Sequence, residues 1–133
     1  MIERDYIMRL IREFMAALSV LLHKKDTEQR REGIRLLCDK YVGPYSFCIT
    51  ATTDELMTFF ADMDSTYRLP RMEMLAELLA AEADNVSSPM RTMLLEKALA
   101  LFTAVENGDN TFSITRRQRI AQIEDILEEE TVN

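Results

Sequence analysis

The hydrophobic positions near the start of the chain recur at steps of three and four over residues 6–22. This spacing places them on one face of an amphipathic helix. The residues on that face are Ile7, Leu10, Ile11, Phe14, Leu18 and Leu21. Arg9, Arg12 and Glu13 interrupt the run, which leaves it too short for a membrane span of about 20 apolar residues. The acids Glu3 and Asp5 precede it, unlike the basic start of a secretory signal, so we expect a helix that packs against a soluble core.

A second apolar stripe on the same helix consists of Met8, Met15 and Leu22. It makes the apolar arc wider than one neighbouring helix would cover. We therefore expect the helix either to lie between two neighbours or to share this face with a second copy of the chain, and we take the stripe as the candidate self-association site. The polar face mixes acids with arginines, which is not typical of a helix that lies on a lipid surface.

The same spacing predicts five further helices, joined as antiparallel hairpins. They cover residues from about 27 to 41, 52 to 63, 70 to 84, 89 to 108 and 113 to 127. Residue types that start or stop helices set these boundaries. The main ones are Gly43 and Pro44, the capping box Thr52–Glu55, Pro70, Pro89, Gly108, and Ser113 or Thr115. We expect a polar break over residues 64–69 and a frayed tail from about residue 129, because three glutamates there oppose the helix dipole.

Composition agrees with an all-α protein that folds as a single domain over residues 1–133. The chain is 47% hydrophobic and has only three glycines and three prolines, which leaves few turns for a sheet. Its net charge of −7 repels phosphate backbones, so we expect no nucleic-acid partner. One histidine, His23, and two cysteines, Cys38 and Cys48, do not form a zinc-binding set. We expect a cytoplasmic protein with reduced thiols, no metal, no cofactor and no membrane contact.

A possible catalytic motif lies at Asp62, Asp64 and Thr66, which have the DxDxT spacing of haloacid-dehalogenase-type phosphotransferases. Enzymes of that type need the first aspartate at the end of a parallel strand. The preceding residues instead have a helix cap and helical spacing. We therefore expect no enzyme, and keep a Mg²⁺-dependent phosphohydrolase that uses Asp62 and Asp64 as an alternative.

Arg116, Arg117 and Arg119 begin the last predicted helix. Positive charge at a helix N-terminus opposes the helix dipole, so something must compensate it. One explanation is ion pairing with Glu106, Asp109 or the acids at positions 124 and 125. The other is a site for an anion or an acidic peptide, which makes the three arginines our candidate binding residues.

Two segments resemble a family of small bacterial helical proteins whose C-terminal helices are similar to tetratricopeptide repeats. These segments are DYIMRLIREF, from residue 5, and LEKALALFTAVENGDNTFSITRRQRIAQIEDIL, from residue 95. Ala98, Phe102 and Val105 match the small, aromatic and small positions of a second repeat helix. Asn110 stands where the repeat usually has proline, and residues 70–84 lack its usual aromatic residue and glycine.

The resemblance implies a tetratricopeptide-like stack of helical hairpins with a binding role, and it implies no activity. From the sequence we therefore expect a non-catalytic protein–protein interaction or scaffolding module of about six helices. The alternative is a homodimeric structural protein that associates through the first helix.

Overall fold

The computed structural model describes residues 2–110 and 113–132, and within them it contains seven helices and no strand. The helices are α1 (Ile2–Leu22), α2 (Thr27–Tyr41), α3 (Tyr45–Thr50), α4 (Thr53–Ala61), α5 (Ser65–Ala83), α6 (Met90–Gly108) and α7 (Ile114–Val132). The predicted all-helical fold is therefore confirmed. The short helix α3 was not predicted, because its six residues are too few to show a helical period.

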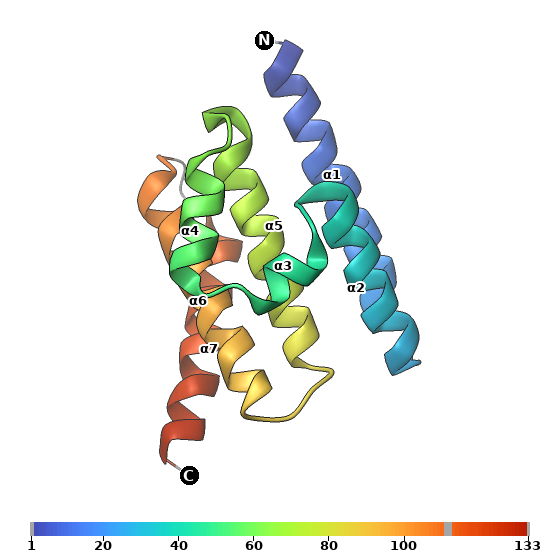
Figure 1. Cartoon of the computed structure of the whole chain (residues 1–133), viewed down its shortest axis with the longest axis vertical. Coiled ribbons are helices and arrows are strands. Elements are labelled where there is room, and N and C mark those ends of the chain that lie inside the picture. Colours follow the sequence, from blue (N-terminus) through green and yellow to red (C-terminus); the bar gives the residue numbers. More distant parts are fainter. Residues whose placement is uncertain (1, 111–112, 133) are drawn as a thin grey trace.

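Helix α5 lies at the centre of the molecule (Figure 1). It packs most extensively against α6 and also contacts α1, α2 and α4. Helices α1 and α2 pair with each other on one side, and α7 packs along α6 on the other. The core therefore forms around α5 and is sealed by helices from both ends of the chain.

The pairing of α1 with α2 places the Leu21 side chain of α1 against Gly33 of α2. A Cβ atom at Gly33 would lie 2.2 Å from Leu21 Cδ1, so the absence of a side chain at Gly33 permits this approach. Farther along the pair, the rings of Phe14 and Tyr41 meet edge to face with centroids 5.6 Å apart. Phe14 is fully buried, so the predicted inward face of the first helix is the one that packs on the core.

Helix α5 begins at Ser65, five residues before Pro70, so the predicted polar break over residues 64–69 is wrong. Two side chains stabilise this junction. The Asp64 carboxylate accepts a hydrogen bond from the Thr66 backbone N–H at 2.9 Å and so caps the helix. The Arg68 guanidinium donates to the backbone carbonyls of Phe60, Ala61 and Met63 at 2.9–3.1 Å. Arg68 thereby satisfies carbonyls at the end of α4, which lack partners within their own helix.

The ends of the last two helices agree with the sequence only in part. The Ser113 hydroxyl accepts a hydrogen bond from the Arg116 backbone N–H at 3.2 Å, which confirms the predicted cap of α7. Helix α6 begins one residue after Pro89 rather than at it. Helix α7 extends to Val132, so the tail that we expect to fray from about residue 129 is helical in the structure. The Thr92 hydroxyl donates to the Glu130 carboxylate at 2.5 Å and ties this end of α7 to the start of α6.

The apolar stretch of α1 does not amount to a membrane span. Among the described residues, no helix combines the length with the hydropathy that crossing a bilayer requires.

Candidate functional site

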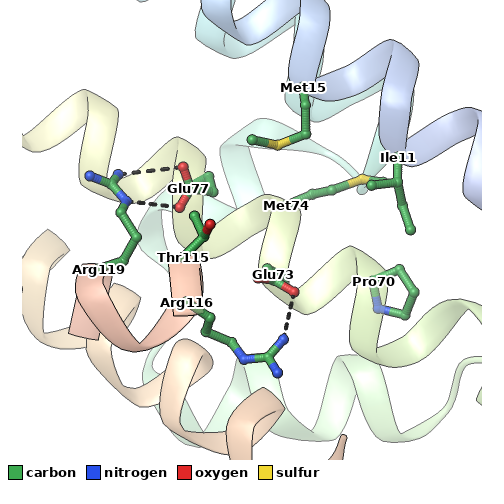
Figure 2. Close-up of a pocket in the computed structure, with 9 residues that line it drawn as sticks. All are labelled: Ile11, Met15, Pro70, Glu73, Met74, Glu77, Thr115, Arg116 and Arg119. Carbon is green, nitrogen blue, oxygen red and sulfur yellow. Dashed lines mark hydrogen bonds and ion pairs between the residues drawn. The ribbon is translucent and has the colours of Figure 1, made fainter. Parts of the chain in front are cut away.

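A groove opens between α1, α5 and the first turns of α7 (Figure 2). Its cavity has a volume of about 200 Å³. The lining residues are Ile11 and Met15 from α1, Pro70, Glu73, Met74 and Glu77 from α5, and Thr115, Arg116 and Arg119 from α7. Helix α5 forms the floor, and the other two helices form the walls.

One side of the groove is apolar. Figure 2 shows Met15 and Ile11 extending from α1 beside Met74 of α5. Met74 is buried, whereas Met15 keeps 43% of its surface exposed. Methionine side chains are flexible and polarisable, so such a surface can adapt to the shape of a bound side chain. The apolar wall is thus accessible to a ligand without rearrangement of the core.

The opposite side of the groove is charged, and Arg116 is its most buried member. Its side chain is only 3% exposed. The guanidinium contacts Glu106 at 2.9 Å, Glu73 at 3.2 Å and Asp109 at 3.2 Å. Ion pairing with Glu106 and Asp109 belongs to one of the two explanations that the sequence left open, and both contacts are present. Arg116 therefore joins α5, α6 and α7 and is surrounded by carboxylates, which disfavours an anion at this position.

The other two arginines, Arg117 and Arg119, contact different glutamates. Arg119 binds both carboxylate oxygens of Glu77 through Nε and Nη2, at 3.0 and 3.4 Å, across the groove wall (Figure 2). Arg117 contacts Glu106 at 2.6 Å, is 60% exposed and does not line the groove. The predicted arginine cluster is therefore divided between two faces of α7, and two of its members serve as one charged wall of the groove.

Within the charged wall, burial and the neighbouring Arg116 have opposite effects on the pKa of Glu73. Burial beside the groove raises the pKa of Glu73, and the positive charge and hydrogen bond of Arg116 offset only part of this effect. The carboxylate is partly buried, with 36% of its side chain exposed, and Arg116 stabilises its charged form. Loss of that partner would leave a partly buried charge uncompensated.

The predicted self-association residues lie on α1, which forms one wall of the same groove. Met8, Met15 and Leu22 are 45%, 43% and 47% exposed, and they follow one side of α1 at intervals of seven residues. Met15 also lines the groove. The structure thus brings together two candidate sites that lie about a hundred residues apart in the sequence.

The contribution of α5 to the groove was missed by the sequence analysis. Glu73 and Glu77 are four residues apart and face Arg116 and Arg119, which are three residues apart. Both spacings place side chains on one face of a helix. This complementary pattern is a signal in the sequence, but it identifies a pair of helices only when their packing is known.

The two residues of the alternative catalytic hypothesis, Asp62 and Asp64, lie at helix ends. Asp62 is the C-cap of α4 and Asp64 is the N-cap of α5. The hydrogen bond from the Thr66 backbone N–H lowers the pKa of the Asp64 carboxyl. Across the described residues, no three side chains of His, Cys, Asp or Glu lie close enough together to hold a metal ion.

A second polar cluster lies at the other end of α5, around the buried Glu82. Its carboxylate accepts hydrogen bonds from Arg31 Nε at 3.2 Å, from the Tyr45 hydroxyl at 2.9 Å and from Asn85 Nδ2 at 3.0 Å. Desolvation and the neighbouring Glu82 raise the pKa of the Tyr45 phenol. These contacts tie α2 and α3 to α5, so we assign them a structural role.

The two cysteines and the single histidine also have contacts within the fold. Cys38 and Cys48 are both free thiols buried in the core. The Cys38 thiol donates to the Gly43 carbonyl at 3.3 Å. His23 lies at the end of α1, where Nδ1 is 2.7 Å from the Ser19 carbonyl. They therefore serve as core and helix-end residues.

Comparisons of the chain with models of protein families, with curated proteins and with solved structures found no match. The groove and its neighbouring methionine stripe are therefore the observations on which a functional proposal can be built.

Proposed function

We propose that this chain is a non-catalytic protein–protein interaction module. Its binding surface consists of the groove between α1, α5 and α7 together with Met8, Met15 and Leu22, and we call it the methionine face. The ligand is an amphipathic helix of a protein partner, which inserts apolar side chains beside Met15. The observation that carries this proposal is an exposed apolar stripe whose central residue, Met15, lines a preformed groove.

The chemistry of the groove favours an apolar helix over a small charged ligand. Its arginines are already paired with Glu73 and Glu77, so a free anion would have to compete with carboxylates held in place. Apolar side chains face no such competition at Ile11, Met15 and Met74. Helix-in-groove recognition uses this combination of apolar anchors with charges at the rim that set orientation.

The likeness to tetratricopeptide repeats supports the same proposal. Such repeats stack helical hairpins and present a surface to peptides or helices. Here α5, α6 and α7 pack consecutively, and Ala98, Phe102 and Val105, the residues that carry the likeness, are buried. We accordingly propose a tetratricopeptide-like arrangement in a bacterial cytoplasmic protein, with the repeat handedness taken from the likeness.

Site-specific photo-crosslinking tests the proposed function. A photoreactive amino acid is placed at position 15 of the full chain in its native host, and the products are identified by mass spectrometry. We expect one predominant protein adduct whose crosslinked segment is an amphipathic helix. Position 20 is the matched control, because Val20 lies on the same helix and is 67% exposed but does not line the groove.

Two outcomes would contradict the proposed function. One is the same set of adducts at positions 15 and 20, which would indicate random collisions. The other is the absence of any protein adduct at position 15 while the variant remains folded by circular dichroism. Hydrolysis of a generic phosphate ester that depends on Mg²⁺ and is abolished by Asp62→Asn would instead favour the enzyme.

A further inference from the structure

We propose that the helix bound at the methionine face is α1 of a second copy of this chain. The two α1 helices lie antiparallel across a twofold axis that passes close to Met15. This inference rests on the proposed function, because it uses the same surface and names the partner.

The spacing of the exposed residues carries the argument. Met8, Met15 and Leu22 are separated by seven residues each, which is the interval at which one helix presents the same side to another. When two identical helices run antiparallel about Met15, Met8 of one copy faces the partner's Leu22. The two Met15 side chains meet at the axis. The stripe is therefore complementary to itself, as a twofold interface requires.

The stripe is not needed for the fold of one chain. The core-facing positions of α1 are Ile7, Phe14, Leu18 and Leu21, all buried. Met8, Met15 and Leu22 lie beside this face and each keep more than 40% of their surface exposed. A second copy can consequently bury them without moving any residue out of the core, and burial of this apolar surface supplies the driving force.

The charges near the ends of α1 agree with the antiparallel direction. The same pairing brings Asp5 near the start of α1 opposite the partner's Lys25, which follows the end of its α1. Both residues are exposed. Within residues 2–110 and 113–132, the structure shows no ion pair for Asp5 or Lys25, so both are available to a partner. A parallel arrangement would instead place like charges together, and it would align the two helix dipoles unfavourably.

The groove provides space next to the axis. It begins at Met15 and is bounded on its apolar side by Ile11 and Met74. The flexible Met15 side chains of the two copies can therefore pack against each other or turn into this space. This adaptability permits a close approach of the two helices near the axis, where bulky rigid side chains would hold them apart.

Sedimentation equilibrium of the full chain over a range of concentrations tests the association. We expect a dimer that dissociates on dilution, and a Met15→Glu variant that stays monomeric at every concentration, because two carboxylates would meet at the axis. Val20→Glu is the matched control on another side of the same helix, and it should dimerise like the original chain. Circular dichroism verifies that both variants keep their helical content.

Cysteine crosslinking tests the direction of the pairing. Under mild oxidation, Met15→Cys should link to itself, while Met8→Cys should link to Leu22→Cys in a mixed sample but not to itself. The original chain is the control, since Cys38 and Cys48 are buried. Efficient self-linking of Met8→Cys would overturn the antiparallel arrangement.

The outcomes separate this inference from the proposed function. If the original chain is a monomer at all concentrations while position 15 crosslinks to a different protein, the dimer is refuted and the interaction module stands. If a dimer forms but Val20→Glu rather than Met15→Glu dissociates it, the axis at Met15 is refuted. If position 15 yields no protein adduct, both proposals fail.

Discussion

Helices α1 and α5 are both long and rich in apolar residues, yet they are buried to very different extents. From Met72 to Ala83, every residue of α5 except Glu73 and Glu77 is buried. Among residues 4–22 of α1, only four side chains are buried, and Met8, Met15, Val20 and Leu22 are exposed. The difference arises because α1, α2, α4 and α6 all pack on α5, whereas α1 has neighbours on one side. The number of neighbours, rather than hydrophobicity, decides which residues form the core.

The polar residues of the two helices differ in the same way. Glu82 of α5 is 2% exposed, and its carboxylate is satisfied by Arg31, Tyr45 and Asn85. The charged side chains of α1, such as Arg9 and Arg12, are exposed to solvent. A buried carboxylate is tolerated only with such partners, so α5 is fixed by directional contacts as well as by packing. Helix α1 can form new contacts more easily.

The largest expected effect is a loss of stability from truncation in α5. Leu75 is 1% exposed, so Leu75→Ala should lower the free energy of unfolding by about 2–5 kcal/mol, because it removes buried methyl groups and leaves a cavity. The matched change on α1, Met15→Ala, should cost well under half as much. Urea unfolding of both variants measures the difference, and equal losses would contradict the contrast between the helices.

A smaller loss is expected at the charged wall of the groove. Arg116→Met should destabilise the protein by about 2–3 kcal/mol, because it leaves three carboxylates without their shared cation, although each is partly exposed. The control Arg117→Met should change stability by no more than about 0.5 kcal/mol, since the side chain of this arginine is 60% exposed and solvent screens its ion pair with Glu106. The same urea assay compares them. A small effect of Arg116→Met would show that the wall does not depend on this ion-pair network.

The hydrogen bond between Tyr45 and Glu82 predicts a pH-dependent effect. Tyr45→Phe should cost about 1 kcal/mol at neutral pH, because Glu82 loses one of its donors. The pKa of the Tyr45 phenol is raised above its ordinary value of 10.0, so the native state keeps this proton at a pH where the unfolded chain loses it. The contribution to stability is present below pH 10 and is lost as the pH rises toward the folded pKa.

Unfolding measured from neutral to alkaline pH tests this linkage. The original chain should lose stability above about pH 10 more steeply than Tyr45→Phe, because the variant lacks the titrating group. Tyr6→Phe is the control, since Tyr6 is exposed on α1, and its curve should follow that of the original chain. Parallel curves for the original chain and Tyr45→Phe would show that the phenol is not held by α5.

The smallest effect on stability is expected on the methionine face. Met8→Gln should change the free energy of unfolding of the monomer by no more than about 0.5 kcal/mol, because Met8 is nearly half exposed. The same change should weaken self-association by replacing an apolar contact at each end of the dimer interface. Urea unfolding at low protein concentration and sedimentation equilibrium separate the two effects. A large loss of monomer stability would mean that the stripe belongs to the core.

Local patterns were sufficient for most of the helices and for part of the site. The spacing of apolar residues located α1, and the capping box at Thr52 and Glu55 located α4. Each of these signals depends on residues that are close together in the sequence. The spacing also separated the methionine stripe from the inward face of α1. The extension of α5 before Pro70 was missed, because it is stabilised by Arg68, which reaches back to the end of α4.

The sequence by itself determined the all-helical fold, the approximate position of most helices and the two apolar faces of α1, because helical hydrogen bonds and caps join residues that are close along the chain. Only the tertiary structure decided that Met15, Glu73 and Arg116 share one groove and that Arg117 lies outside it. The physical reason is that the groove forms where three helices, distant in sequence, leave a gap in their packing. Its position therefore depends on how the whole core assembles around α5.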